Sequence, residues 1–250
     1  MGSGMLPAGA YVTLEHEYIL ILRKGGKREF SKDSEKQNRR QSAIFWEERN
    51  LYFSDIWFDI KGSRQGLHDK ELRKRSAAFP FELAYRLINM YSVKNDMVLD
   101  PFLGTGTTLA AAMTAGRNSI GCEIEPNFLD SIMAIKNNIV RLAGEITETR
   151  LKAHLSFIAE RTAAGKPIKH RNLPYGFPVI TLQEKELILH ELIKVTQINE
   201  KSMCAIYSDD PQPDFCGSGI LLPSTDAGAV AEPGPKKKTN IQTNIQLELF

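Results

Sequence analysis

The fold of this chain is decided by residues 97–126, which read MVLDPFLGTGTTLAAAMTAGRNSIGCEIEP. A short apolar run before Asp100 is typical of a buried strand. The small-residue turn 104–108 follows it, and the Ala-rich residues after the turn favour a helix that ends at Gly116. Residues 119–122 then predict a second short strand with Glu123 at its end. The order strand, glycine turn, helix, strand and acid is typical of an α/β sheet.

These residue types fit the binding of a nucleoside. A carboxylate at the end of the second strand, Glu123, offers two acceptor oxygens to the two hydroxyls of a ribose. Glycine in the turn lets the backbone approach a ligand closely, because glycine has no Cβ. The turn lacks the third glycine of the dinucleotide fingerprint GxGxxG and the lysine of the phosphate-binding sequence GxxxxGK[ST]. We therefore predict a nucleoside ligand that carries little phosphate.

Two motifs in this stretch carry a resemblance to a known family. DPFLGTGTT at residues 100–108 and GCEIEP at residues 121–126 resemble the S-adenosylmethionine motifs of amino-methylating DNA methyltransferases, which act on adenine N6 or cytosine N4. The resemblance implies a Rossmann-like α/β sheet and S-adenosyl-L-methionine as the cofactor. It implies that Glu123 binds the ribose and that the rest of the cofactor contacts Asp100, Phe102, Gly104, Gly106, Thr107 and Thr108. The alternative is an ordinary βαβ turn in some other α/β protein.

A helix is expected after Pro80, because apolar residues recur at helical spacing over about the next ten residues. In the family that these motifs resemble, the element here precedes the cofactor strand and closes over the methionine end. This sequence has Arg75-Ser76-Ala77-Ala78 where the family usually has His-Pro. Ser76, Ala77 and Phe79 are therefore weaker cofactor candidates than Asp100 or Glu123.

Composition indicates a globular chain of one domain, or of one domain and an appendage. The chain has 250 residues and a formal net charge of +2, which is too small by itself to prove a nucleic-acid partner. The cysteines Cys122, Cys204 and Cys216 have no metal-ligand spacing, which fits a reducing cytoplasm. No apolar run is long enough to span a membrane.

Basic and aromatic residues upstream of the cofactor stretch suggest contact with double-stranded DNA. Residues 23–40 are rich in Lys and Arg, which suits phosphate contacts, although a solvated loop has the same pattern. Residues 42–65 combine aromatic side chains with further basic ones; most of the rings are expected in the core. The candidate DNA-binding residues are Arg23, Lys24, Lys27, Arg28, Arg39, Arg40, Arg49 and Arg64.

The sequence contains no catalytic [DNS]PP[YFW] loop, which in the resembled family holds the target amine. DPQP at residues 210–213 inserts Gln between the prolines and lacks the aromatic residue. In the permuted subgroup of the family the loop lies upstream of the cofactor motifs, so it would precede residue 1. We therefore predict the C-terminal portion of a methyltransferase, with a sheet that is incomplete at its N-terminal side and no catalytic residue in this chain. An exposed sheet edge favours a second chain or an N-terminal fragment as partner.

The remaining sequence predicts four regions. Residues 9–70 end the catalytic region and include a recognition segment, with a strand expected at 18–22; residues 71–142 bind the cofactor. Residues 143–207 form a helical extension, although 182–198 could be a helix followed by a strand. Residues 208–250 are a flexible linker and tail. Gln246–Phe250 reads QLELF, which resembles peptides that dock on the bacterial sliding clamp; the alternative is a terminal strand.

Two other functions remain open at this point. The chain could be an inactive DNA-binding or interaction module with the same fold, or a methyltransferase acting on RNA or protein. His154, His170 and His190 share no ligand spacing, so we expect them at the surface and predict no metal site.

Overall fold

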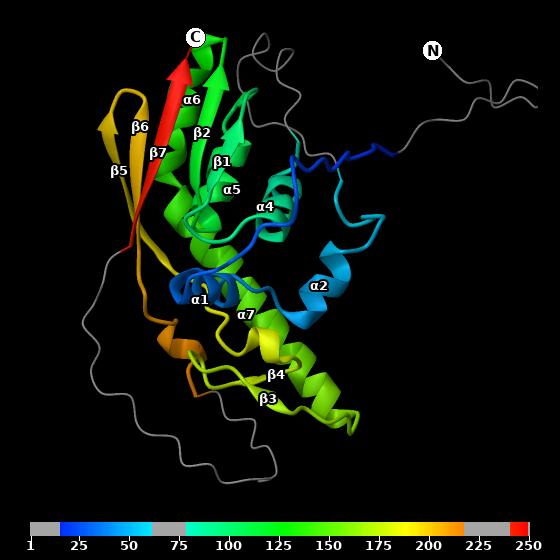
Figure 1. Cartoon of the computed structure of the whole chain (residues 1–250). Helices are drawn as coiled ribbons and strands as arrows, with labels where there is room; N and C mark the ends of the chain where they lie inside the picture. The colour runs from blue at the N-terminus through cyan, green and yellow to red at the C-terminus, as the bar shows by residue number, and fades with distance from the viewer. Residues whose placement is uncertain (1–15, 62–78, 218–240, 250) are drawn as a thin grey trace, which may run out of the picture. The chain divides into compact units, whose positions relative to one another are not determined.

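The computed structural model describes residues 16–61, 79–217 and 241–249 (Figure 1). They fall into two units, Met1–Phe30 and Ser31–Phe250. The described part of the first unit contains no helix or strand, so the prediction of a strand at residues 18–22 is wrong. Tyr18, Leu20 and Leu22 are exposed. An apolar run becomes a strand only when a neighbouring strand accepts its backbone hydrogen bonds, and residues 16–30 form no such ladder.

The second unit is built on a five-stranded sheet in the order β1-β2-β7-β6-β5. β1 and β2 are parallel, β2 and β7 are parallel, and β6 is antiparallel to both β7 and β5. The expected α/β class is therefore confirmed, and β1 is an edge strand within the described residues. The strands are β1 (Met97–Asp100), β2 (Asn118–Glu123), β5 (Leu192–Asn199), β6 (Ser202–Tyr207) and β7 (Ile241–Leu249).

The decisive stretch forms the predicted strand–helix–strand unit. β1 leads into α5 (Thr107–Thr114), which packs against β2, α4 and α7. Gly116 ends the helix with a φ of +71°, a conformation that favours glycine. Asp100 pairs with Gly121 in the parallel register, so Glu123 extends two residues beyond the end of β1.

Helices on either side of this unit begin close to where the sequence predicts. Pro80 is the N-cap of α4 (Phe81–Tyr91), and the Ala-rich faces of α4 and α5 pack together. The residues after β2 form three short segments, η1 (Pro126–Phe128), α6 (Leu129–Ala134) and η2 (Ile135–Asn137). α7 (Ile139–Ala163) then runs to the residues before Gly165. α1 (Asp33–Gln41) and α2 (Trp46–Tyr52) precede them.

The C-terminal half differs from the prediction in two respects. Only residues up to Ala163 continue the helix, and the supposed helical extension then contributes β5 and β6 to the main sheet. The prediction of a flexible tail is wrong for residues 241–249, because β7 pairs with β2 on one side and with β6 on the other. An apolar end that alternates with polar residues satisfies its backbone groups best inside a sheet. A sliding-clamp contact through Gln246–Phe250 would require β7 to leave the sheet.

Two main hydrophobic clusters support the second unit. The first lies between the sheet and α5, α6 and α7 and includes Leu109, Ile132 and Met203. The second surrounds Phe45, Leu151 and Phe177, near the short strands β3 (His170–Arg171) and β4 (Pro178–Val179). Figure 1 shows α7 running from the sheet to this second cluster. None of the helices among the described residues is both long and apolar enough to cross a membrane.

Candidate functional site

The candidate site lies at the carboxyl ends of β1 and β2. In parallel α/β sheets ligands bind outside the carboxyl ends of the strands. The turn between β1 and α5 is held against β2, because the Leu103 N–H donates to the Cys122 carbonyl at 2.8 Å. Gly121 makes this close approach possible: a Cβ there would lie 2.5 Å from a methyl carbon of Leu103.

The turn requires glycine at two positions. Gly104 has a φ of +56° and Gly106 a φ of +88°, both in the left-handed region. A Cβ on Gly106 would also lie 2.6 Å from Cδ1 of Ile135, whereas one on Gly104 would meet nothing within 4 Å. The space beside Gly104 is therefore open, while Gly106 is needed for the packing of the turn on η2.

Glu123 is oriented by two backbone donors. Its Oε2 accepts a hydrogen bond from the Gly104 N–H at 2.6 Å, and its Oε1 accepts one from the Glu125 N–H at 2.8 Å. An ionised carboxylate has about four acceptor sites. The two backbone bonds therefore hold the group at the glycine turn and leave acceptor sites on both oxygens.

Asp100 is held in a similar way at the end of β1. Its Oδ1 accepts from the Phe102 N–H at 3.0 Å, and its Oδ2 accepts from the Thr108 hydroxyl at 2.5 Å. Thr108 therefore acts through Asp100, a role that its place in the motif did not reveal. Thr107 and Thr108 begin α5, whose first N–H groups and dipole favour electron-rich ligand atoms.

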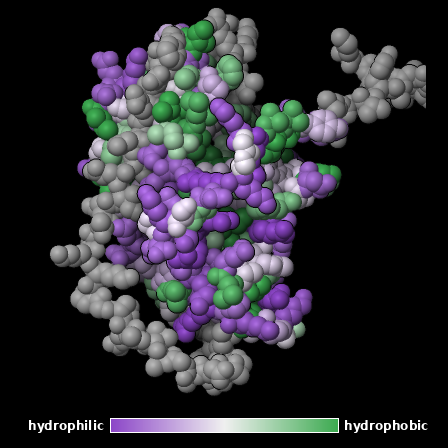
Figure 2. Space-filling model, in the orientation of Figure 1, coloured by the Kyte–Doolittle hydropathy of each residue, from purple (hydrophilic) through white to green (hydrophobic). Residues whose placement is uncertain are grey.

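Apolar side chains are exposed around these carboxylates. Phe102 is 87% exposed and Ile124 84% exposed, one beyond each strand, and Leu99 of β1 is 63% exposed. Figure 2 shows hydrophobic surface at the upper end of the sheet and hydrophilic surface over α1 below it. The site thus combines two oriented carboxylates with apolar surface, which suits a ligand with a flat aromatic part and a hydroxyl-bearing part.

The remaining cofactor candidates are placed less completely. Phe79 lies directly before α4 and is 38% exposed. Ser76 and Ala77 lie outside the described residues. The sequence-based assignment of these two side chains stays a prediction.

Arg86 of α4 is a residue that the sequence did not single out. Its side chain is 3% exposed, and it forms ion pairs with Glu82 and Asp59. Its guanidinium carbon lies 5.1 Å from the Tyr52 ring centroid and 5.4 Å from that of Trp57. The hydrogen bond from Arg86 lowers the pKa of the Asp59 carboxyl. Arg86 therefore fastens the aromatic segment 52–59 to the helix that precedes β1.

The candidate DNA-binding residues are spread over both units and the residues between the described ranges. Arg23, Lys24, Lys27 and Arg28 belong to the first unit; Arg39, Arg40 and Arg49 belong to the second; Arg64 lies outside the described residues. Arg40 pairs with Glu186 at 2.8 Å, and the Arg49 guanidinium lies 5.3 Å from the Phe53 ring centroid. Phe45 and Tyr52 are buried, as expected for the core, while Phe53 and Phe58 are exposed.

The DPQP sequence lies far from the site along the sheet. β6 is antiparallel to β7 and β7 is parallel to β2, so residues after Tyr207 leave the sheet at the end opposite Glu123. The Tyr175 hydroxyl donates to Gln212 Oε1 at 2.6 Å, and Gln212 Nε2 donates to the Leu189 carbonyl at 2.8 Å. Gln212 therefore has a structural role, and DPQP is no substitute for a catalytic loop.

Two of the three histidines contradict their predicted surface location. The side chain of His154 is fully buried, and that of His190 is 9% exposed. Burial and the nearby Lys94 lower the pKa of His190 to about 4. Lone histidines within apolar stretches are frequently core residues. The spacing of His154 and His190 in the sequence does not show which loops cover their side chains in the fold.

Buried basic side chains gather at the amino ends of β1 and β2, opposite the candidate site. Lys94, Arg117, Arg150 and His190 line a cavity of about 30 Å³. Burial lowers the pKa of Lys94 well below its usual value and that of Arg117 to about 10. Lys94 donates to the Gln41 and Ile188 carbonyls, and Arg117 to that of Ser92. These bonds tie α1 and the loop before β5 to the start of β1.

Comparison with known proteins gives a consistent family. The N6_N4_Mtase model, described as DNA methylase, matches residues 2–135. The type II methyltransferase M.MthZI of Methanothermobacter thermautotrophicus is 55% identical over 190 residues, covering 76% of this chain and 52% of that protein. M.MjaI of Methanocaldococcus jannaschii, also a type II methyltransferase, is 54% identical over 126 residues, covering 50% of this chain and 40% of that protein.

A solved structure is also similar to part of the chain. It is assigned as a candidate DNA modification methylase from Thermus thermophilus, complexed with S-adenosyl-L-methionine. It is 37% identical, has a TM-score of 0.42, and covers 54% of this chain and 47% of that one. The chain spans about half the length of the curated relatives named above. Because the family model matches more than half of its residues, the chain belongs to the N6_N4_Mtase family of DNA methylases.

Proposed function

We propose that this chain is the cofactor-binding and DNA-contacting part of a site-specific DNA methyltransferase. The reaction transfers a methyl group from S-adenosyl-L-methionine to the exocyclic amine of adenine or cytosine. The observation that carries the proposal is the placement of Asp100 and Glu123 at the ends of adjacent parallel strands, beside the glycine turn. The names of the relatives, which are type II methyltransferases, support the same reaction.

The cofactor would use the acceptor sites that the backbone leaves open. The ribose hydroxyls donate to Glu123, and the adenine ring lies against the exposed Phe102 or Ile124 side chains. Backbone N–H groups at the start of α5 donate to the methionine end, which occupies the open space beside Gly104. Asp100 accepts a hydrogen bond from the Thr108 hydroxyl, and this bond keeps the turn in this shape. Activation of the target amine is assigned to a segment outside this chain, because no catalytic tetrapeptide occurs in the sequence.

Calorimetry with S-adenosyl-L-methionine tests the binding step. A hydrogen bond to a charged group contributes about 1.5–3 kcal/mol, so we expect Glu123→Gln to weaken binding roughly 10- to 100-fold. Glu125→Gln is the matched control, because Glu125 is also a carboxylate beside the turn but is not assigned to the cofactor. Equal affinity in wild type and Glu123→Gln would contradict the assignment.

We also propose that the missing catalytic segment docks at the free edge of β1. Within the described residues no strand pairs on that side, and Met97 and Leu99 are 56% and 63% exposed. An unpaired strand edge with apolar side chains is a template for a further strand. The match covers about half the length of the Methanothermobacter relative. Such a segment would then belong to a longer chain or to a second chain.

A complementation assay tests this docking. Labelled methyl transfer to duplex DNA is expected only when the chain is mixed with, or joined to, a relative's upstream half. Leu99→Lys should abolish the gain, whereas Leu182→Lys, also at an exposed leucine, should not. Full activity of the chain alone would show that the catalytic loop is present in it after all. Transfer to RNA or protein in place of DNA would favour those substrates.

DNA contact is proposed for the basic residues Arg23, Lys24, Lys27, Arg28, Arg39, Arg40, Arg49 and Arg64. Removing one phosphate contact should reduce the slope of log affinity against log salt by about 0.9. Replacing Arg23, Lys24 and Lys27 together by Gln should therefore flatten the slope. The control is Lys152→Gln, which removes a lysine paired with Glu148 on α7. An unchanged slope in the triple variant would remove these residues from the interface.

A further inference from the structure

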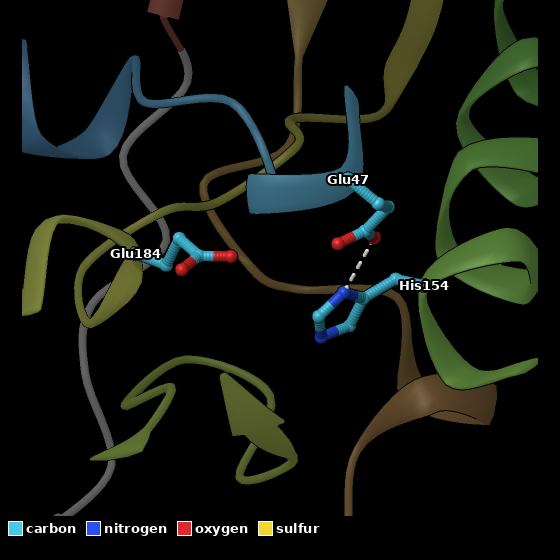
Figure 3. Close-up of side chains that lie close together, drawn as sticks. All are labelled: Glu47, His154 and Glu184. Atoms are coloured by element: carbon cyan, nitrogen blue, oxygen red, sulfur yellow. Dashed lines mark hydrogen bonds and ion pairs between the residues drawn. The ribbon is translucent and has the colours of Figure 1, made fainter. Parts of the chain in front are cut away.

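Outside the proposed cofactor end, the described residues contain a buried cluster of one imidazole and two carboxylates. Glu47 of α2, His154 of α7 and Glu184 of η3 (Leu182–Glu184) place one ligand atom each within 4.8 Å of one another. Figure 3 shows these three side chains entering one space from three separate segments. His154 is 0% exposed and Glu184 1% exposed. The cluster adjoins the second hydrophobic cluster, around Phe45 and Phe177.

The hydrogen bonds of His154 orient one ring nitrogen toward the carboxylates. Nε2 lies 3.0 Å from the Pro178 carbonyl, which can only accept, so Nε2 carries a proton. Nδ1 then faces Glu47 Oε1 at 2.7 Å. An ion bound by both atoms at about 2.0–2.2 Å would replace this hydrogen bond and hold the two atoms about 3.3 Å apart. Metal-ligating histidines commonly donate their other N–H to a backbone carbonyl, as Nε2 does here.

The carboxylates of the cluster offer oxygen ligands to a cation. The oxygens of Glu184 accept hydrogen bonds from the Trp46 N–H and from the N–H and hydroxyl of Thr181, which hold the carboxylate in place. Glu47 Oε2 is buried and has no hydrogen-bond partner in the described part of the chain. A divalent ion would balance both carboxylates and give Glu47 Oε2 a partner.

We propose that Glu47, His154 and Glu184 bind a divalent transition-metal ion, with Zn²⁺ as the best match. Zn²⁺ takes imidazole nitrogen and carboxylate oxygen in tetrahedral sites with bonds of about 2.0–2.2 Å. His154 Nδ1, one oxygen of Glu184 and the carboxylate of Glu47 supply the ligands. Small side-chain movements, mainly of the half-buried Glu47, draw the ligand atoms together. The ion ties α2 and η3 to α7, away from the carboxyl ends of β1 and β2, so its role is structural.

The metal content of the tag-free full chain tests this site. The protein is stripped with a chelator, reloaded with Zn²⁺ and assayed by elemental analysis and calorimetry, without any methylation assay. We expect about one Zn²⁺ per chain. The X-ray absorption spectrum at the zinc edge should show one imidazole ligand on the ion. Zn²⁺ should also raise the unfolding temperature of the wild type, because an ion that binds only the folded state stabilises it.

Variants distinguish this site from adventitious binding. Glu47→Gln keeps the shape of the side chain and should weaken Zn²⁺ binding at least tenfold, and His154→Asn should do the same if it folds. Glu145→Gln, an exposed carboxylate on α7, and His170→Asn are the matched controls and should bind as the wild type does. Equal Zn²⁺ binding by wild type and a folded Glu47→Gln protein, or no binding by either, would overturn the proposal.

Discussion

At the residue scale, the candidate site depends on side chains and glycines whose roles are set by one or two neighbours. Asp100 and Glu123 each use part of their acceptor capacity on the backbone of the turn. These bonds orient both carboxylates before any ligand arrives, which lowers the entropic cost of binding. Glycine at 106 and 121 lets the turn pack close to η2 and β2.

Gly121→Ala should disturb the turn without removing any polar contact. The new Cβ would overlap the buried side chain of Leu103, and overpacking of this kind costs about 1–3 kcal/mol. Gly144→Ala on α7, where a Cβ meets nothing within 4 Å, should stabilise by roughly 0.4–1 kcal/mol instead. Chemical unfolding of both variants measures the difference, and equal stabilities would contradict the close approach of Leu103 to β2.

His190 should make folding stability depend on pH. Its pKa is about 4 in the folded protein, against an ordinary value of 6.5. Between these values the unfolded chain binds more protons than the folded one, so this contribution to stability falls as the pH falls. The loss approaches about 3 kcal/mol below the folded pKa.

His190→Asn keeps a donor for the Ser208 carbonyl, to which His190 Nδ1 donates at 2.9 Å, but cannot titrate. Urea unfolding across the interval should show a flatter pH dependence in this variant than in the wild type. His170→Asn is the control, because His170 is only partly buried. Identical pH profiles for wild type and His190→Asn would contradict the role of the buried imidazole.

At the element scale, two connections hold distant parts of the second unit together. β7 lies between β2 and β6, so the C-terminal residues join the parallel part of the sheet to the β5–β6 hairpin. Arg86 joins α4 to the aromatic segment 52–59. Both connections link residues far apart in sequence, and both adjoin the strand–helix–strand unit that contains the candidate site.

Removal of residues 241–250 should unfold or greatly weaken the sheet. β2 and β6 would each lose a complete ladder, and a buried backbone group without a partner costs about 1–3 kcal/mol. Hydrogen exchange should accelerate in Asn118–Glu123 and Ser202–Tyr207 first. A chain lacking only Phe250 is the control. Unchanged protection of both strands in the truncated chain would contradict the placement of β7.

Arg86→Met should release segment 52–59 from α4. The change leaves Glu82 and Asp59 without their cation and removes the contacts with Tyr52 and Trp57, at an expected cost of about 3–5 kcal/mol reduced by the partial exposure of both acids. Hydrogen exchange in this segment measures the release. Arg141→Met, which removes an exposed ion pair with Glu145, should change stability by less than about 1 kcal/mol. Similar losses in both variants would argue against a fastening role for Arg86.

At the scale of the whole molecule, the chain consists of a folded second unit preceded by a first unit without secondary structure in residues 16–30. Apolar side chains are exposed both in the described part of the first unit and on β1. The chain spans about half the length of the Methanothermobacter relative.

Deletion of residues 1–30 should therefore leave the stability of the second unit within about 1 kcal/mol of that of the full chain. Tyr18, Leu20 and Leu22 are exposed, so the loss of these three side chains removes little buried apolar surface. Thermal unfolding of the two chains at equal concentration measures the effect. A large drop would indicate that residues 18–22 pair with the sheet, as the apolar pattern at first suggested.

The strand–helix–strand unit and its acidic residues could be predicted from the sequence, because that unit is built from local signals. Strand length, turn glycines and helix propensity all act within about 30 residues, and each agrees with the others along 97–126. The start of α4 at Pro80 was predictable for the same reason. The family resemblance was readable in the same residues.

The pairing of distant segments could not be predicted from the sequence, because it depends on the packing of the whole chain. The apolar end of the chain reads equally well as a docking peptide or a strand, and the partners β2 and β6 settle it as β7. The run at residues 18–22 has a strand pattern but no ladder, since a strand needs a neighbour that its own sequence does not encode. The burial of His154 beside Glu47 and Glu184 depends on α2 and η3 packing on α7. Such contacts come from whole-chain packing, which local periodicity does not record.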